Sequence, residues 1–282
     1  MLLNMTPSGN EIQRKLLLSH ASKTKTIFVL TLVASVLIAL FVGSYYAKTP
    51  QSVDSSFIRN IAKIEVPGVG TGTAFLLTSS EGTHHGILMT AGHVVSGAHD
   101  KTVNLIFEQV KGEDGEPLVT TGSIIWQSDV PSYDPYTIEK MRMDVALVKL
   151  DDMSVLPEDV VGFTIKPEPE MQEEIVIYGF PKGDEYSSTG IVSSLKFQDC
   201  EDLITMDIQL VGGLSGAPVF NKENGEVIAM AVGSRHDELN YGITASGEQV
   251  VVAAQNDLFN SAIKMRRVIE VLDAAGMLNL IQ

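Results

Sequence analysis

The alternation of apolar and polar positions divides the chain into three regions. Residues 26–46 (TIFVLTLVASVLIALFVGSYY) are 21 consecutive positions without a charged side chain. From about residue 57 onward, short apolar runs alternate with clusters of glycine, proline, asparagine and aspartate. Residues 261–275 carry apolar side chains at the spacing of one helical face. The pattern therefore predicts one long apolar helix, many short strands and a closing helix.

The uncharged segment has the length of a membrane-spanning helix, because about 20 residues cross a hydrocarbon core roughly 30 Å thick. A cleaved signal peptide fits less well, since 25 residues precede the segment, and Tyr45 and Tyr46 stand where a cleavage site needs small residues. A buried core helix is the other alternative, but 21 uncharged residues are hard to place inside a small β domain. We expect an uncleaved signal anchor.

Basic residues set the expected orientation of this anchor. Residues 1–25 carry four lysine and arginine side chains, whereas Lys48 is the only one close behind the apolar segment. Segments rich in these side chains stay on the cytoplasmic side. We therefore expect a cytoplasmic tail (1–25), a single-pass cell-membrane anchor (26–46), a polar tether (47–56) and a periplasmic or other extracytoplasmic domain (57–282).

The apolar runs after residue 57 have the length and composition of β-strands. They are rich in Val, Ile, Leu, Phe and Thr, and clusters such as GEDGEP, PKGDE and NKENGE separate them. About a dozen short strands with such punctuation predict two small barrels or a β-sandwich. The predicted strands are 61–66, 72–77, 86–90, 103–108, 122–127, 145–150, 174–178, 190–197, 203–209, 217–220, 227–232 and 242–245.

The closing helix is predicted at 261–275, with Ser261 as a cap at its start and Gly276 at its end. Six residues follow Gly276, so we expect no further folded domain after it. Residues 246–260 give the least readable pattern of the chain.

The net charge of −15 is unevenly distributed. Residues 1–25 contain four basic and one acidic side chain and residues 26–46 contain none, so residues 47–282 carry −18. A domain this acidic is not expected to bind nucleic acid or an anionic membrane surface. Cys200 is the only cysteine, so no intrachain disulfide is expected, and its carboxylate neighbours disfavour a reactive thiolate.

Two candidate catalytic residues lie beside predicted strands. His93 follows an apolar run and a Thr-Ala-Gly segment, and Asp144 directly precedes the apolar strand 145–150. Read singly, each is also consistent with a turn residue at a strand end. The functional interpretation is an aspartate that orients a general-base histidine through a hydrogen bond. His84 and His85 are interpreted as solvated turn residues, and no metal site is expected.

The third candidate is Ser215 in the sequence GGLSGAPVF (212–220). Glycines permit the unusual backbone angles of a tight, exposed turn. In such a turn, the N–H groups of Gly213 and Ser215 are candidate donors to the oxyanion of a tetrahedral intermediate. The alternative is a glycine-rich hairpin with an incidental serine.

The order of the three residues makes the joint signal more specific. His93, Asp144 and Ser215 follow one another at separations of 51 and 71 residues. This is the chain order of chymotrypsin-type peptidases and differs from those of subtilisins and α/β-hydrolases. Together with six further sequence segments, this order makes residues 61–276 resemble a trypsin-like serine peptidase of the HtrA/Deg branch. These segments are GTGTAF (70–75), YGFP (178–181), TGIVS (189–193), ITMD (204–207), YGITAS (241–246) and the closing helix.

This resemblance implies an all-β fold of two six-stranded antiparallel β-barrels with a C-terminal helix. It implies a serine endopeptidase in which Ser215 attacks a peptide carbonyl, His93 transfers the proton and Asp144 orients His93. Protein or peptide substrates, no cofactor, and a role in extracytoplasmic protein processing or quality control follow from the same likeness. Relatives of this type commonly form trimers, which makes a trimer the oligomer to test.

The chain departs from the family's pattern around the serine. Ala217 stands where the family usually has a second glycine. Leu214 stands where digestive trypsins have an aspartate that pairs with a freshly cut N-terminus, so we expect no activation by such a cut. HtrA-type peptidases usually carry a PDZ domain after the peptidase, and we expect none here.

Candidate substrate-binding residues flank the serine in the fold that the resemblance implies. The S1 pocket, which receives the P1 side chain, is expected between residues 208–211 and 231–234. Neither stretch contains a charged side chain, which predicts a small or medium apolar P1 residue. The rival interpretation of the whole chain is a catalytically silent or partner-activated trypsin-fold binding or scaffold protein. The candidate pocket residues are Ile208, Val211, Val232, Gly233 and Ser234.

Overall fold

A computed structural model describes most of the chain after the predicted tether. No helix within the described ranges is both long and apolar enough to cross a membrane. The predicted anchor at 26–46 lies outside those ranges, as do the cytoplasmic tail and most of the tether, so these three segments stay predictions. The described residues are 55–78, 84–112, 114–129, 137–235, 240–243, 249–253 and 259–281.

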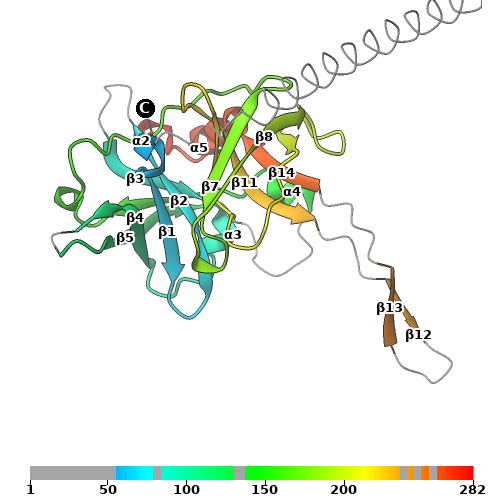
Figure 1. Cartoon of the computed structure of the whole chain (residues 1–282), viewed down its shortest axis with the longest axis horizontal. Coiled ribbons are helices and arrows are strands. Elements are labelled where there is room, and N and C mark those ends of the chain that lie inside the picture. The colour runs from blue at the N-terminus through cyan, green and yellow to red at the C-terminus, as the bar shows by residue number, and fades with distance from the viewer. Residues whose placement is uncertain are drawn as a thin grey trace, which may run out of the picture. The chain divides into compact units, whose positions relative to one another are not determined.

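Six antiparallel strands close the first barrel in the order β1-β2-β3-β6-β5-β4 (Figure 1). β1 pairs with both β2 and β4, so the sheet closes on itself and leaves no free edge. Buried and less buried positions alternate along most of β4, as expected when one face of a strand lines a barrel core. The strands are β1 (Ile61–Val66), β2 (Gly70–Thr78), β3 (His84–Thr90), β4 (Thr102–Lys111), β5 (Pro117–Gln127) and β6 (Ala146–Leu150).

The second barrel closes in the order β10-β11-β14-β9-β8-β7, again with antiparallel pairing throughout. Two further strands, β12 and β13, pair with each other as a separate two-stranded sheet. The two closed six-stranded barrels confirm the predicted all-β architecture. The strands are β7 (Glu174–Gly179), β8 (Tyr186–Ser194), β9 (Leu203–Met206), β10 (Pro218–Asn221), β11 (Val227–Arg235), β12 (Asn240–Ile243), β13 (Gln249–Ala253) and β14 (Phe259–Lys264).

The C-terminal helix begins later than the sequence pattern predicted. α5 spans Met265–Ala274, and Ser261 belongs to β14, where it pairs with Thr205 of β9 and is fully buried. Ser261 is therefore not a helix cap, because the residues before Met265 close the barrel instead. Gly276 follows the helix with a φ of +71°, as a C-terminal glycine does.

The strand before this helix is β14, which pairs with β9 and β11 and leads directly into α5. The segment 241–246, which resembles a family strand in sequence, lies before it in the chain. Residues 240–243 form β12 and pair with β13, and residues 244–246 lie outside the described ranges.

The other helices are short and lie at strand ends or in connections. They make no layer of their own, so the strands and α5 supply most of the fold. The helices are α2 (Ser55–Ile58), α3 (Gly92–Val95) and α4 (Ile138–Met141), with 3-10 helices η1 (Met153–Val155), η2 (Pro181–Gly183) and η3 (Leu278–Leu280).

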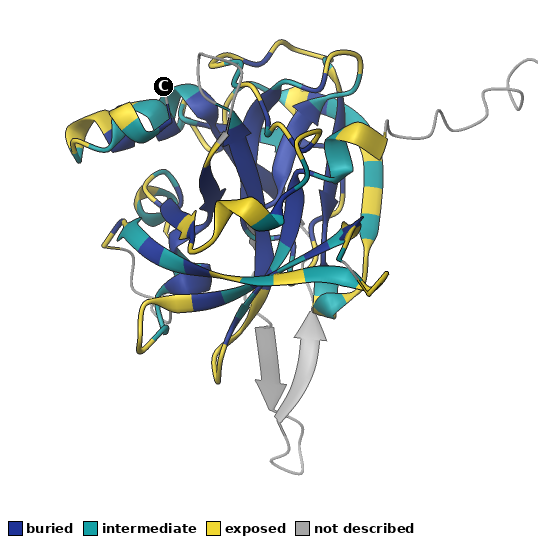
Figure 2. Cartoon of the chain, turned by 90° about the vertical axis from the view of Figure 1, so that its left-hand side faces the viewer, coloured by how far each residue is buried: buried dark blue, intermediate teal, exposed yellow. Residues whose placement is uncertain are grey.

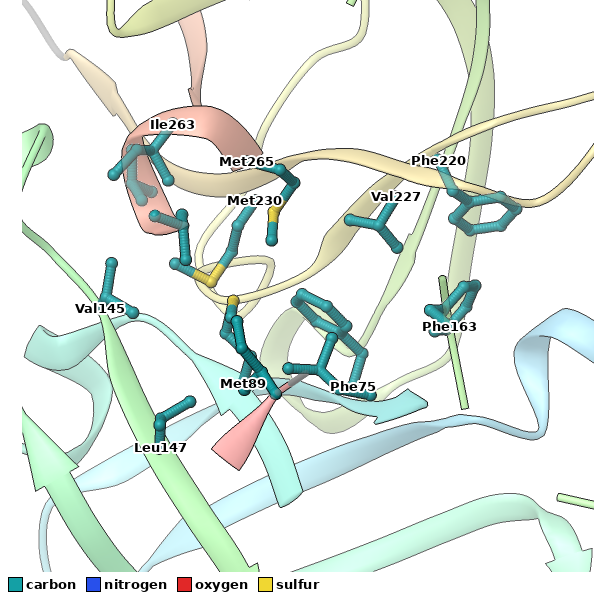
Figure 3. Packing of buried hydrophobic residues seen from close by; sticks show 14 of the residues in the cluster. Phe75, Met89, Val145, Leu147, Phe163, Phe220, Val227, Met230, Ile263 and Met265 are labelled. Carbon is teal, nitrogen blue, oxygen red and sulfur yellow. The ribbon is translucent and has the colours of Figure 1, made fainter. Parts of the chain in front are cut away.

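Buried apolar side chains form one cluster inside each barrel and a third between the barrels. Figure 2 shows buried positions along the strands and exposed ones mainly in the turns. In the third cluster, Phe75 and Met89 of the first barrel lie beside Met230 of the second and Met265 of α5 (Figure 3). Burying each such side chain contributes about 1.5–3 kcal/mol. The interface between the barrels is therefore a packed core.

The connection from β6 to β7 ties the two barrels together. Phe163 forms a parallel bridge with Leu77 of β2, and Ile165 forms one with Val227 of β11. The Phe163 ring is buried, with centroids 6.0 Å from Phe75 and 5.4 Å from Phe220. One short segment thus contacts both barrels, and its burial resists their separation.

Candidate active site

His93 lies in α3, directly after β3 leaves the first barrel. Its side chain is about a quarter exposed, at 25%. Gly92 brings the backbone close to its neighbours, because a Cβ at this position would lie 2.9 Å from Ser128 Oγ and 3.1 Å from Asp144 Oδ1. The glycine in the Thr-Ala-Gly segment therefore allows the histidine backbone to approach the aspartate.

Asp144 is fully buried and accepts hydrogen bonds from two groups of one residue. Its Oδ2 lies 2.5 Å from Nδ1 of the His93 ring, and its Oδ1 accepts the His93 backbone N–H at 2.8 Å. A carboxylate facing Nδ1 keeps the proton on Nδ1, which leaves the ring lone pair on Nε2. The structure thus brings together His93 and Asp144 in the arrangement that a general base requires.

Ser128 supports the strand end that carries Asp144. Its N–H donates to the Val145 carbonyl at 2.9 Å, and its hydroxyl accepts the Val145 N–H at 3.2 Å. Ser128 is buried and was not singled out from the sequence, because a serine after a predicted strand resembles an ordinary turn residue. Its contacts fix the peptide that follows Asp144.

Ser215 lies on a tight loop that leads into β10, and the residue is partly exposed. Gly213 and Gly216 have φ angles of +102° and +84°, which favour glycine. The loop is closed by Ala217 N–H, which donates to the Leu214 carbonyl at 2.9 Å. Neither Gly213 N–H nor Ser215 N–H has an acceptor among the residues that the structure describes.

The serine loop packs against the segment that carries the histidine. A Cβ at Gly216 would lie 2.9 Å from the Ala91 nitrogen, two residues before His93. The Ser215 carbonyl accepts a hydrogen bond from Thr73 N–H of β2 at 3.0 Å. The serine loop of the second barrel thus packs against β2 and against the segment that leads to His93 in the first barrel.

The predicted pocket residues lie on the second barrel. Ile208 and Val232 are buried, whereas Val211 is 38% exposed. Gly233 and Ser234 continue β11, where they pair with Ser261 and Asn260 of β14; their side chains lie outside the described part of the chain. An S1 pocket at this place stays a prediction.

Asn260 is a further residue that the sequence pattern missed. Its side chain is buried, and Oδ1 accepts the Leu210 N–H at 2.8 Å. This bond joins β14 to the stretch 208–211 expected to line the pocket. The unreadable pattern of residues 246–260 gave no signal for it.

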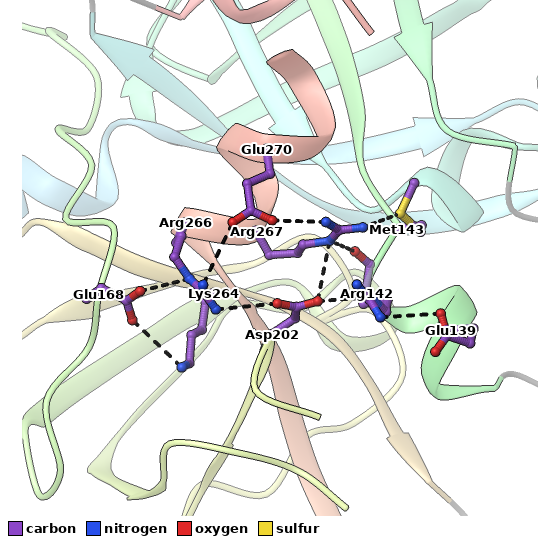
Figure 4. Close-up of polar contacts among 9 residues, drawn as sticks. All are labelled: Glu139, Arg142, Met143, Glu168, Asp202, Lys264, Arg266, Arg267 and Glu270. Carbon is purple, nitrogen blue, oxygen red and sulfur yellow. Dashed lines mark hydrogen bonds and ion pairs between the residues drawn. The ribbon is translucent and has the colours of Figure 1, made fainter. Parts of the chain in front are cut away.

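A group of charged side chains supports the turn before Asp144 (Figure 4). Asp202 Oδ2 pairs with Arg142 Nε at 2.9 Å and with Arg267 Nε at 3.5 Å. Arg267 also donates to the Arg142 carbonyl at 3.3 Å. Asp202 precedes β9 and Arg267 belongs to α5, so the second barrel and its helix hold the chain two residues before Asp144.

Two closed antiparallel barrels with a His–Asp pair and a glycine-bounded serine between them define a chymotrypsin-type peptidase fold. Residues 72–230 match the family model described as the trypsin-like peptidase domain, and the chain belongs to this family. The resemblance to trypsin-like peptidases is therefore confirmed. No curated protein matches the chain significantly.

Several solved structures match three quarters or more of this chain. Rv3671c from M. tuberculosis H37Rv, a serine-to-alanine mutant in an inactive form, has 18% identity and a TM-score of 0.52, covering 82% of this chain and 93% of that one. The MamO protease domain from Magnetospirillum magneticum (apo form) has 12% identity and a TM-score of 0.48, with coverages of 76% and 96%. Deg5 has 17% identity and a TM-score of 0.49, with coverages of 75% and 86%. At 18% identity, the match to Rv3671c supports the fold alone.

Proposed function

We propose that this protein is a serine endopeptidase that cleaves peptide bonds through an acyl-enzyme. The observation that carries the proposal is the contact of His93 with buried Asp144, beside a serine loop in which the N–H groups of Gly213 and Ser215 lack acceptors among the described residues. These features supply a general base, a nucleophile and two oxyanion donors. Among the alternatives, a non-cleaving scaffold would not require the two N–H groups to stay unbonded.

In the proposed reaction, Ser215 Oγ forms a bond to the substrate carbonyl carbon while its proton passes to His93 Nε2. The carbonyl π electrons move to oxygen, and the N–H groups of Gly213 and Ser215 stabilise that oxyanion. When the C–N bond breaks, His93 returns the proton to the leaving amine. Water then hydrolyses the acyl-enzyme, with His93 again as the base. Asp144 stabilises the imidazolium formed in each half-reaction.

We further propose that the peptidase domain is extracytoplasmic and anchored in the cell membrane by residues 26–46. The uncharged segment and the basic residues before it support this placement. The substrates would then be extracytoplasmic proteins, and the role would be their processing or quality control. An apolar P1 preference is part of the same proposal.

The lone cysteine offers a test of the orientation. Cys200 is partly exposed, so a membrane-impermeant maleimide should label it in intact cells if the domain lies outside. A Cys200→Ser/Ser8→Cys variant, with its cysteine in the tail, should be labelled only after lysis. The reverse pattern would place the domain in the cytoplasm.

The activity is tested by comparing new protein N-termini in cells that express the wild type or Ser215→Ala. Cleavage products present only with the wild type, and intact precursors that accumulate with the variant, would support the proposal. Identical profiles from equal amounts of both proteins would favour the binding or scaffold function.

A further inference from the structure

Two sequence segments of unassigned role meet at one side chain in the structure. Thr73 of β2 belongs to GTGTAF, and Phe180 belongs to YGFP, 107 residues later. Thr73 is fully buried, at 0% exposure, and its hydroxyl accepts the Phe180 N–H at 3.1 Å. The first barrel thus places a hydroxyl group against the second barrel, beside the serine loop.

The same residue holds two carbonyl groups of the serine loop. Thr73 Oγ1 donates to the Gly213 carbonyl at 2.9 Å, and Thr73 N–H donates to the Ser215 carbonyl at 3.0 Å. Because a peptide group is planar, fixing its carbonyl also fixes the N–H of the next residue. These two bonds therefore fix the peptide planes on either side of Leu214–Ser215.

The Gly213 N–H is set by the preceding peptide, whose carbonyl belongs to Gly212. That carbonyl accepts the Lys182 N–H at 3.3 Å. Lys182 lies two residues after Phe180, in the short turn whose Phe180 N–H donates to the Thr73 hydroxyl. The turn also fits closely, since a Cβ at Gly213 would lie 2.5 Å from the Phe180 carbonyl oxygen. One hydroxyl thus contacts Gly213 directly and supports the turn that contacts Gly212.

We propose that Thr73 is the positioning residue of the oxyanion hole: its hydroxyl fixes the peptides around Gly213, so that the N–H groups of Gly213 and Ser215 stay available to the oxyanion. This inference rests on the proposed peptidase function. Thr73 does not touch the reacting atoms, and it acts through the serine loop.

Close neighbours of Thr73 restrict the orientation of its side chain, and so fix the position of its hydroxyl. A Cβ at Gly179 would lie 2.6 Å from Thr73 Oγ1, and Thr90 Oγ1 donates to the Thr73 carbonyl at 2.7 Å. The β-branched side chain also restricts χ1. Valine has nearly the same shape but no hydroxyl, so Thr73→Val would leave the Gly213 carbonyl and the Phe180 N–H without partners in a buried place.

The test measures reaction of the full-length protein with a fluorophosphonate probe, as the rate constant at saturating probe and as the probe's apparent affinity. Removing an oxyanion donor outright lowers turnover by roughly 10²–10³-fold. An N–H donor that remains but is positioned less precisely should reduce the rate by a smaller factor. Thr73→Val should therefore lower the rate constant of labelling about tenfold, with little change in the apparent affinity for the probe. Thr73→Ser should restore the rate. The control is Thr121→Val on β5, which makes the same substitution at an exposed hydroxyl that donates to Asp151; it should react like the wild type.

A structural role alone would lower thermal stability without changing the rate of the folded protein. The low-field NMR signal of the proton between His93 Nδ1 and Asp144 should persist in Thr73→Val and show that the pair is intact. If the valine variant does not fold, Thr73→Ala and Thr73→Ser, which differ by one oxygen, replace it. Wild-type rates in the hydroxyl-free variants would overturn the inference, whereas an unreactive wild type would overturn the peptidase function itself.

Discussion

Replacing Asp144 with asparagine should keep one of the two hydrogen bonds that the carboxylate accepts and change the other. In the wild type, Oδ1 accepts the His93 backbone N–H at 2.8 Å and Oδ2 faces Nδ1 of the ring at 2.5 Å. In Asp144→Asn, the amide oxygen must stay on the backbone N–H, since an NH₂ group there would face another donor. The NH₂ group then faces Nδ1 and makes that nitrogen an acceptor.

The ring proton is therefore expected on Nε2, where it blocks proton transfer from Ser215. The analogous substitution in a well-studied triad lowers kcat about 10⁴-fold, which corresponds to about 5.5 kcal/mol of transition-state stabilisation. We expect a loss of similar size in the rate of fluorophosphonate labelling. The fold should remain, because asparagine has nearly the volume of aspartate.

Asp152→Asn is the matched control for this substitution. Asp152 lies in the connection after β6, where its carboxylate accepts hydrogen bonds from Ser154. This variant should be labelled at the wild-type rate. A labelling rate for folded Asp144→Asn within tenfold of the wild type would refute the assigned role of the aspartate.

Three further predictions concern stability. Gly216→Ala should destabilise the protein by at least about 2 kcal/mol in thermal unfolding, because a left-handed φ of +84° disfavours a Cβ and the Ala91 backbone stands 2.9 Å from it; an unchanged melting temperature would contradict this geometry. Asp202→Ala should cost about 2 kcal/mol by denaturant titration, because Arg142 and Arg267 lose their shared carboxylate and keep only the more exposed partners Glu139 and Glu270; a loss below about 0.5 kcal/mol would contradict a stabilising role for Asp202. Burial raises the pKa of Glu173, but hydrogen bonds from Asn221 and the Glu170 N–H and the bond to Lys166 outweigh it, so the pKa lies below its ordinary 4.5. The ionised Glu173 side chain therefore contributes its full stabilisation above about pH 4.5, and this contribution is lost as the pH falls through the lowered pKa of the folded protein. The free energy of unfolding of Glu173→Gln should fall less steeply than that of the wild type below pH 4.5. Equal slopes for the two proteins would contradict the prediction.

The barrel strands other than β14 could be predicted because short apolar runs form them and clusters of turn residues separate them. The start of α5 could not, since the apolar residues of β14 also fit a helical period and extend it toward Ser261. β14 pairs with β9 and β11, and only these tertiary contacts decide between strand and helix. The pattern of residues 246–260 likewise concealed β13 and the first residues of β14.

The candidate catalytic residues could be proposed from the sequence because chemistry restricts their types, and because their order along the chain is typical of one fold. The residues that hold them in place were missed for a physical reason. Thr73 contacts Gly213 over 140 positions and Asn260 contacts Leu210 over 50, so no local pattern marks either pair. Threonine is also an ordinary residue in a strand, and Asn260 lies in β14, at the end of the stretch 246–260 whose pattern predicted no element.

Whether Ser215 is a nucleophile is tested most directly by locating the fluorophosphonate adduct. The full-length protein is treated with the probe, digested and analysed by tandem mass spectrometry, with Ser215→Ala and His93→Ala in parallel. We predict one adduct on Ser215 in the wild type, none in Ser215→Ala and little in His93→Ala. A folded wild type without an adduct, or an adduct that persists in Ser215→Ala, would contradict the assignment of this protein as a serine peptidase.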